Sequence, residues 1–319
     1  MAEESVAHII ADFLGVLVSI IFICLREFIF LIVPRPRKNV ADKVVLLTGA
    51  GHGVGRLIAH RLGDLGARCV LIDINKDTNE AVADEVRAKG QQAWAYQCDV
   101  SNEEQIKEIH QRIRREVGPI DILINNAAIV NCQELLEIPS ASIRRNFEVN
   151  ILSHMWTIRE FLPAMKERGE GHIVAMSSIA GVLGTAYLTD YCASKFAVRG
   201  LMTALEEELY VQGYSEKIHL TTVCPVAINT GMFQSLLTRF AWAVPILEPD
   251  NVVDKVIEAF LTNRKEIVLP SYVGYVNKLV NCLLPDRAIL KLQRFLQYET
   301  GPHKEASSTD MENAAKKDL

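Results

Sequence analysis

The chain has 319 residues, of which 49% are hydrophobic, and a formal net charge of −5. This length suffices for one large hydrophobic core or two modest ones, and the acidic balance excludes a basic surface of the kind that binds nucleic acid. The seven cysteines are scattered, with no C-x-x-C pair and no Cys/His cluster at metal-ligand spacing, which favours reduced thiols in a cytosol-like compartment.

The first predicted element is an apolar segment over residues 9–33, followed by the basic residues Arg35, Arg37 and Lys38. A helix over this segment would extend about 37 Å, enough to cross a bilayer, and the basic residues would hold the main domain on the cytosolic side. The preceding acidic pair and the lack of a small-residue cleavage site disfavour a cleaved signal peptide. We therefore expect residues 1–38 to anchor the protein to a membrane.

A narrow polar seam runs along this expected helix. Its residues fall within about 80° of each other on a helical wheel, and they are Ser5, His8, Asp12, Gly15, Ser19 and Arg26. Asp12 and Arg26 would be costly in hydrocarbon, so the seam suits a helix that lies in the membrane interface or contacts protein. Spanning and monotopic attachment both stay open, and a core helix of a soluble protein is the alternative.

Strand-like and helical runs alternate after the basic residues. The strand-like runs are largely apolar and β-branched, as strands buried on both faces should be; they cover residues 43–49, 68–74, 92–100, 120–128, 171–179, 217–225 and 265–271. One helical run, residues 101–118, is predicted to begin at a capping box of Ser101 and Glu104. The alternation predicts an α/β, doubly wound Rossmann fold over residues 39–271, with a seven-stranded parallel sheet and helices on both faces.

The first strand-like run leads directly into TGAGHGVG at 48–55 and then into a helix. Its glycines allow a tight turn, close approach of a pyrophosphate and close helix–strand packing; they are Gly49, Gly53 and Gly55. The second strand ends in Asp73, at a spacing that suits a carboxylate on the adenosine ribose hydroxyls. Because this carboxylate would repel a 2′-phosphate, the motif favours NAD over NADP, a preference that His52 and Lys76 could soften.

A later helical run contains YCASK at 191–195, which places Tyr191 and Lys195 on one helix face. A phenol with a pKa near 10 is a poor base at pH 7, but an ammonium group about 4–5 Å away stabilises the phenolate by roughly 3–4 kcal/mol. The pair could therefore exchange a proton with an alcohol near neutral pH. Ser178 lies thirteen residues before the tyrosine, where its hydroxyl could bind the substrate oxygen as that oxygen gains charge.

Taken together, these motifs resemble the short-chain dehydrogenase/reductase family over about residues 40–270. The resemblance rests on a fixed order of motifs, namely TGAGHGVG at 48–55, CDV at 98–100, NNAA at 125–128, VN at 149–150, SS at 177–178, YCASK at 191–195 and PVAINT at 225–230. Within the family, the apolar leader ending in PRPRKNVADK and the phrases LIDINK and CPVAINTGMF are similar to the membrane-attached retinol dehydrogenases of the epidermal type and the lipid-droplet 17β-hydroxysteroid dehydrogenases. Ala128 and Val226 stand where the family commonly has glycine.

The resemblance implies a catalytic tetrad, namely Asn150, Ser178, Tyr191 and Lys195. Tyr191 would take the alcohol proton, Lys195 would also bond the nicotinamide ribose, and Asn150 would hold a water that relays the proton. Asp99 would meet the adenine edge and Thr230 the nicotinamide carboxamide. The full set expected to bind NAD is Gly49, Gly53, Val54, Gly55, Asp73, Asp99, Asn126, Tyr191, Lys195 and Thr230.

The C-terminal third predicts an apolar substrate. Residues 231–249 are rich in Leu, Phe, Trp and Val and would cover a long or polycyclic molecule, with core helices as the alternative. Residues 272–301 form an apolar and amphipathic segment that would lie on lipid or dock to a partner subunit. Residues 302–319 are polar, and we expect them to be disordered.

The sequence thus predicts a membrane-attached, NAD-dependent dehydrogenase of a lipophilic alcohol. Retinol to retinal ranks first and a 17β-hydroxysteroid second, while an NAD-binding membrane scaffold with little turnover and an NADPH-using carbonyl reductase are the alternatives. The expected location is the endoplasmic reticulum membrane, with the catalytic domain facing the cytosol and the lipid droplet as a second destination. By resemblance, helices over 141–168 and 190–212 would form a homodimer or a higher homo-oligomer.

Overall fold

The computed structural model describes most of the chain, namely residues 6–30, 32–233, 236–237, 239–240, 242–296 and 299–300. The tail expected to be disordered, residues 302–319, lies outside these ranges. The chain divides into two compact units, Met1–Lys38 and Asn39–Leu319.

The first unit is built on the helix α1 (Val6–Ile29). Its span His8–Ile29 is long and apolar enough to cross a membrane, and none of that span is buried in the protein. Part of the polar seam is satisfied within the helix, because the Ser19 hydroxyl donates to the Gly15 carbonyl at 2.9 Å. Such local bonding lowers the cost of placing a serine in an apolar environment.

The second unit is built on a seven-stranded parallel sheet in the order β3-β2-β1-β4-β5-β6-β8. The strands are β1 (Val44–Thr48), β2 (Arg68–Asp73), β3 (Ala93–Gln97), β4 (Ile122–Asn125), β5 (Gly171–Met176), β6 (Ile218–Pro225) and β8 (Glu266–Leu269). The strand order reverses between β1 and β4, and the carboxyl ends of the strands form a crevice at that point. The predicted doubly wound fold is confirmed.

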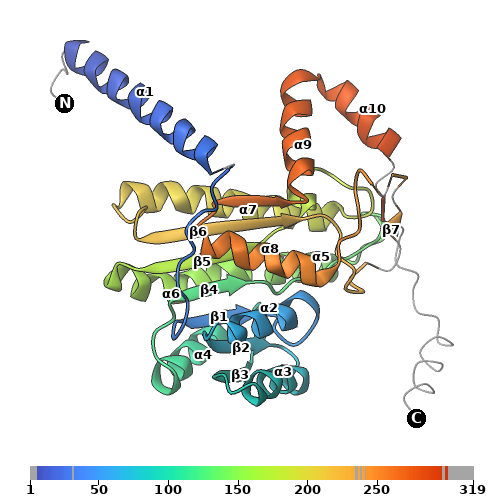
Figure 1. The fold of residues 1–319 in the computed structure, drawn as a ribbon. Coiled ribbons are helices and arrows are strands. Elements are labelled where there is room, and N and C mark those ends of the chain that lie inside the picture. The colour runs from blue at the N-terminus through green and yellow to red at the C-terminus, as the bar shows by residue number, and fades with distance from the viewer. Residues whose placement is uncertain are drawn as a thin grey trace. The chain divides into compact units, whose positions relative to one another are not determined.

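Helices cover both faces of this sheet (Figure 1). One face carries α2 (Gly53–Asp64), α3 (Lys76–Ala88) and α8 (Pro249–Leu261). The other carries α4 (Glu103–Glu116), α5 (Ser140–Phe147), the π-helical turn η1 (Glu148–Leu152), α6 (Ser153–Arg168) and α7 (Thr189–Val211). Successive side chains of β1 alternate between the faces, with Val45 and Leu47 in one core and Val44 and Leu46 in the other. All four are buried, which explains why the strands read as continuous apolar runs.

The predicted capping box of α4 is wrong. The N-cap is Asn102, whose side-chain oxygen accepts hydrogen bonds from the backbone N–H groups of Glu104 at 3.0 Å and Gln105 at 3.2 Å. Asparagine and serine cap helices about equally well, and the Ser101 hydroxyl instead donates to Asp99 at 2.7 Å.

The C-terminal part of the second unit consists of α9 (Ser271–Leu283), α10 (Asp286–Leu296) and a small antiparallel pair, β7 (Leu236–Leu237) with β9 (Glu299–Thr300). Gly274 is the buried residue of α9, and α10 buries none. A Cβ at Gly274 would lie 2.8 Å from the Val268 side chain, so α9 packs closely on β8 at its start and is exposed beyond. The expected substrate cover, residues 231–249, falls only partly within the described residues.

Candidate active site

The glycine-rich loop joins β1 to α2, and its glycines let the backbone line a cavity directly, with no side chain in between. Gly49 and Gly53 adopt positive φ angles of 65° and 51°, which favour glycine. A Cβ at Gly55 would lie 1.9 Å from the Gly49 carbonyl oxygen. The Asn126 carboxamide braces the loop by donating to the carbonyls of Thr48 at 3.0 Å and Gly49 at 3.1 Å. The loop and the N-terminus of α2 therefore fit a pyrophosphate.

Asp73 ends β2 beside this loop. Its carboxylate accepts hydrogen bonds from the backbone N–H groups of Gly51 and Asn75, each at 2.9 Å. A Cβ at Gly51 would lie 2.6 Å from the Thr78 hydroxyl and 3.1 Å from this carboxylate, so the acid lies flush against the loop. The cavity wall thus carries a fixed negative charge next to the phosphate-binding backbone.

Asp99 lines the same cavity and pairs with Arg145 at 2.8 Å. Burial alone would raise the pKa of Asp99, but hydrogen bonds from Ser101 and Arg145 outweigh burial and lower that pKa below its usual value. The arginine comes from α5, forty-six residues further along the chain. No motif in the sequence indicated that this side chain would reach the site.

Tyr191 and Lys195 lie on the first two turns of α7, with the lysine Nζ 5.6 Å from the centre of the tyrosine ring. The ammonium group donates to the Met176 carbonyl at 3.0 Å. Lys195 is only 1% exposed, and this burial lowers its pKa to about 8. Ser178 follows β5, and its hydroxyl oxygen accepts a hydrogen bond from the Ala180 N–H at 3.1 Å.

Asn150 occupies the π-helical turn η1, is fully buried and does not line the cavity. Its side-chain oxygen accepts from the Ile129 N–H at 2.8 Å and its amide donates to the Ile129 carbonyl at 2.8 Å. The amide nitrogen also lies 3.1 Å from the Ser194 hydroxyl. Asn150 therefore fixes the loop after β4 against α7, directly behind the tyrosine and the lysine.

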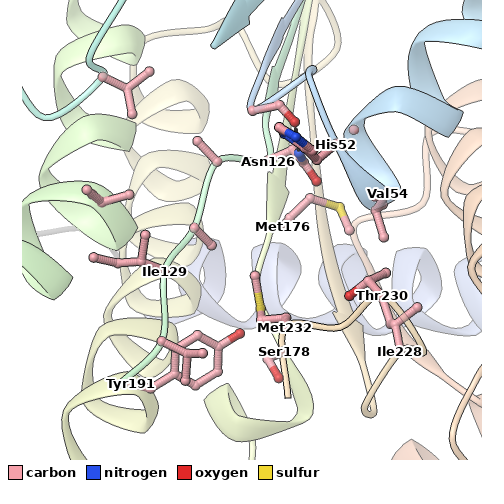
Figure 2. A pocket seen from close by; sticks show the side chains of 18 of the residues that line it. His52, Val54, Asn126, Ile129, Met176, Ser178, Tyr191, Ile228, Thr230 and Met232 are labelled. Carbon is pink, nitrogen blue, oxygen red and sulfur yellow. Dashed lines mark hydrogen bonds between the residues drawn. The ribbon is translucent and has the colours of Figure 1, made fainter. Parts of the chain in front are cut away.

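A cavity of about 690 Å³ brings the other sequence-predicted residues together, namely Gly49, Gly53, Val54, Gly55, Asp73, Asp99, Asn126, Ser178, Tyr191, Lys195 and Thr230. Figure 2 shows His52 and Asn126 at one end and Tyr191 and Ser178 at the other, with Thr230 along the side. A phosphate-binding loop at one end and the tyrosine at the other suit a bound dinucleotide with its nicotinamide beside the tyrosine.

The end around Tyr191 is apolar. The tyrosine ring meets the Phe233 ring edge to face, with centroids 6.1 Å apart, and both belong to a cluster with Cys132, Leu188 and Val130. Further apolar side chains line the cavity there, including Ile129 and Met232. Sequence reasoning missed Ile129 and Val130 as pocket residues, because the loop after β4 carries no periodic signal.

A glycine loop at one end of an elongated cavity and a phenol–ammonium pair at the other define a nicotinamide-dependent oxidoreductase site. A family model described as short chain dehydrogenase matches residues 43–239. The chain belongs to the short-chain dehydrogenase/reductase family, and the resemblance seen in its motifs is confirmed.

Similar proteins refine this placement. The chain is 40% identical to human epidermal retinol dehydrogenase 2 over 277 residues, which cover 86% of this chain and 89% of that protein. It is also 40% identical to human 17-beta-hydroxysteroid dehydrogenase 13 over 294 residues, 92% of this chain and 96% of that one. A solved short-chain dehydrogenase/reductase from Burkholderia phymatum in complex with NAD has a TM-score of 0.69 at 25% identity, covering 84% of this chain and 99% of that chain. A metagenomic short-chain oxidoreductase in complex with NADP has a TM-score of 0.60 at 29% identity, covering 72% and 97%.

Proposed function

We propose that this protein interconverts a lipophilic alcohol and its carbonyl compound with NAD(H) at a membrane surface, and that retinol and retinal are its substrates. The observation that carries the proposal is the apolar cavity end in which Tyr191, Lys195 and Ser178 are the polar groups able to act on an alcohol. An apolar wall with a few convergent polar groups is the usual form of a site for a lipophilic ligand.

These residues divide the work of alcohol oxidation. Bound NAD would accept the hydride from the alcohol carbon. Tyr191 as phenolate takes the hydroxyl proton, and the Lys195 ammonium favours the phenolate because opposite charges attract strongly in a buried site. Ser178 donates a hydrogen bond to the substrate oxygen as it changes charge. In carbonyl reduction, Tyr191 donates its proton instead.

Asp73 supports NAD rather than NADP as the cofactor. Its carboxylate accepts two backbone N–H groups that hold it against the glycine-rich loop, and an additional phosphate nearby would be repelled. We expect NAD to bind at least roughly tenfold more tightly than NADP in a fluorescence titration. Equal affinity would instead support the NADPH-using carbonyl reductase.

Two substrate classes compete because the chain is equally similar to a protein named for retinol and one named for 17β-hydroxysteroids. Membranes carrying the protein should be given NAD with all-trans-retinol or, separately, with estradiol. Tyr191→Phe is the matched control, since it keeps the ring and removes the hydroxyl. Retinal formed above this control supports the proposal, whereas estrone alone assigns the steroid reaction. NAD binding with product from neither substrate favours the scaffold.

The membrane part of the proposal rests on α1 and on the exposed faces of α9 and α10. Tyr275, Leu279 and Leu283 follow each other at four-residue spacing on α9, and all are exposed. The two helices carry four basic side chains and one acidic one, namely Lys278, Arg287, Lys291, Arg294 and Asp286. Apolar stripes with basic neighbours suit an anionic lipid surface. The basic residues after α1 support an endoplasmic reticulum or lipid-droplet location with the second unit facing the cytosol.

We also propose a homodimer or a higher homo-oligomer formed through α6 and α7. Met155 on α6 and Phe196 on α7 are exposed large apolar side chains on these helices. Exposed apolar side chains of this size are favourable to bury between subunits.

A further inference from the structure

A set of buried polar side chains lies behind the active-site cavity, on β4, α5, η1, α6 and α7. Each is at most 3% exposed, and they are Asn125, Asn146, Asn150, Ser153, His154, Thr157, Ser194 and Lys195. Most are connected by hydrogen bonds. The Thr157 hydroxyl lies 2.9 Å from the Asn125 side-chain oxygen, and the Asn150 amide lies 3.1 Å from Asn146 and from Ser194.

His154 is the member of this set whose side chain makes no hydrogen bond at all to the described residues. It lies on the first turn of α6, directly after the π-helical turn that carries Asn150. Its side chain is 1% exposed, and neither Nδ1 nor Nε2 has a hydrogen-bond partner in the part of the chain that the structure describes. An unpaired buried polar group costs roughly 1–3 kcal/mol. A histidine at this position therefore destabilises the fold unless its ring nitrogens find a hydrogen-bond partner, such as an internal water.

The imidazole is coupled electrostatically to Lys195. Burial first, and then the positive charge of Lys195, lower the pKa of His154 to about 3. The ring is therefore neutral at physiological pH, with one nitrogen as a hydrogen-bond donor and the other as an acceptor. On the lysine side, the Met176 carbonyl is the one hydrogen-bond acceptor that the described residues give the ammonium group, which has three N–H donors.

Two further members of the set have buried amide nitrogens without a hydrogen-bond partner among the described residues, Asn125 Nδ2 and Asn146 Nδ2. Two donors and an imidazole within one buried polar set are the groups that hold internal water, which typically makes two to four hydrogen bonds. If His154 served only to fill space in the core, the missing hydrogen-bond partners of the Asn125 and Asn146 amides in the same set would stay unexplained.

We propose that His154 and Lys195 share an internal water, and that this water keeps the lysine protonated while Tyr191 exchanges its proton. The water oxygen would accept from the Lys195 ammonium, and a water O–H would donate to the acceptor nitrogen of the His154 ring. His154 is thus a positioning residue, because it acts on the reaction through Lys195. The role of the lysine rests on the proposed function, whereas the water site is a property of the unliganded protein.

The other groups that face the Lys195 ammonium do not take the place of the proposed water as a hydrogen-bond acceptor. Tyr191 lies on the same helix, with its ring centre 5.6 Å from the ammonium nitrogen. The Cys224 thiol approaches from β6, but burial raises its pKa to about 12, so it is neutral near pH 7. No carboxylate within the described ranges forms an ion pair with Lys195. Removing a hydrating water would therefore desolvate the ammonium further and lower the pKa of Lys195.

Two variants test this contact. His154→Leu removes both ring nitrogens, whereas His154→Gln keeps a donor and an acceptor that cannot be protonated. The readout is the pH dependence of NADH affinity, measured by nicotinamide fluorescence, with Lys195→Met as the reference that lacks the titration. In His154→Leu, we expect the alkaline midpoint of NADH affinity to fall by about one pH unit, which is a tenfold loss of proton affinity. In His154→Gln, we expect the proton affinity to stay within about twofold of the wild-type value. A leucine variant whose profile superimposes on the wild type overturns the proposal.

The water itself can be observed without cofactor or turnover. A high-resolution crystal structure of the wild-type protein is expected to show an ordered water within hydrogen-bond distance of both the His154 ring and the Lys195 nitrogen. A dry site there overturns the proposal, even if His154→Leu fails to fold. Lack of NADH binding would refute the proposed function while leaving this crystallographic result intact.

Discussion

Lys195 is charged in a place where burial opposes its charge, and this conflict has a measurable effect on stability. Its pKa falls from 10.5 to about 8 on folding, so the folded protein binds this proton less tightly than the unfolded chain. The penalty is fully present below pH 8 and disappears as the pH rises from about 8 to 10.5. Stability is thus sacrificed for a cation beside Tyr191, as is common at functional sites.

We expect Lys195→Met to raise the free energy of unfolding at pH 7 by about 1–3 kcal/mol, because the penalty vanishes while one hydrogen bond to Met176 is lost. The same variant should abolish turnover. Denaturant unfolding at pH 7 and pH 10 measures the effect, with exposed Lys255→Met as control, for which no change is expected. A variant that is equally destabilised at both pH values would show that the lysine charge costs the fold nothing.

The cofactor loop can bind a dinucleotide only if β1 and α2 meet closely. Gly55→Ala would place a Cβ 1.9 Å from the Gly49 carbonyl oxygen, which forces the backbone to shift. We expect a loss of at least about 2 kcal/mol in stability and a loss of NADH binding by fluorescence. Gly200→Ala on α7 meets no heavy atom within 4 Å and should stabilise by about 0.5–1 kcal/mol. Tight NADH binding by Gly55→Ala would contradict this role of the loop.

Strands and helices with strong periodicity could be predicted from the sequence. The way these elements connect placed most of the site residues, so most of the site could be predicted as well. Buried strands read as apolar runs, and Asp73 and Ser178 lie near strand ends, which parallel topology gathers at one edge. Arg145 and His154 could not be predicted, since each interacts with a residue more than forty positions away through helix packing. Capping of α4 was misassigned because Asn102 and Ser101 are adjacent and equally able caps.

The molecule has two candidate membrane contacts, the apolar helix α1 and the exposed apolar stripe of Tyr275, Leu279 and Leu283 on α9. The second unit, residues 39–319, is compact by itself and can be studied without α1. We expect it to bind vesicles that contain anionic lipid, and to release as salt rises, because basic side chains flank the stripe.

The double variant Tyr275→Asp and Leu279→Asp should weaken this vesicle binding at least tenfold, since each charge opposes insertion into lipid by roughly 1 kcal/mol or more. Co-sedimentation with vesicles measures it, and Val211→Asp on α7, an apolar position that is even more exposed, is the control. Unchanged binding of the double variant would assign membrane contact to α1 alone.

Isotopic labelling can follow the hydride that we propose passes from a lipophilic alcohol to NAD. All-trans-retinol deuterated at the carbinol carbon should be incubated with NAD and membranes carrying the full-length protein, and the NADH formed analysed by mass spectrometry. We predict NADH that carries deuterium with the wild-type protein and none above background with Tyr191→Phe. Unlabelled NADH, or equal labelling by both proteins, would contradict the assignment of this cavity as a retinol dehydrogenase site.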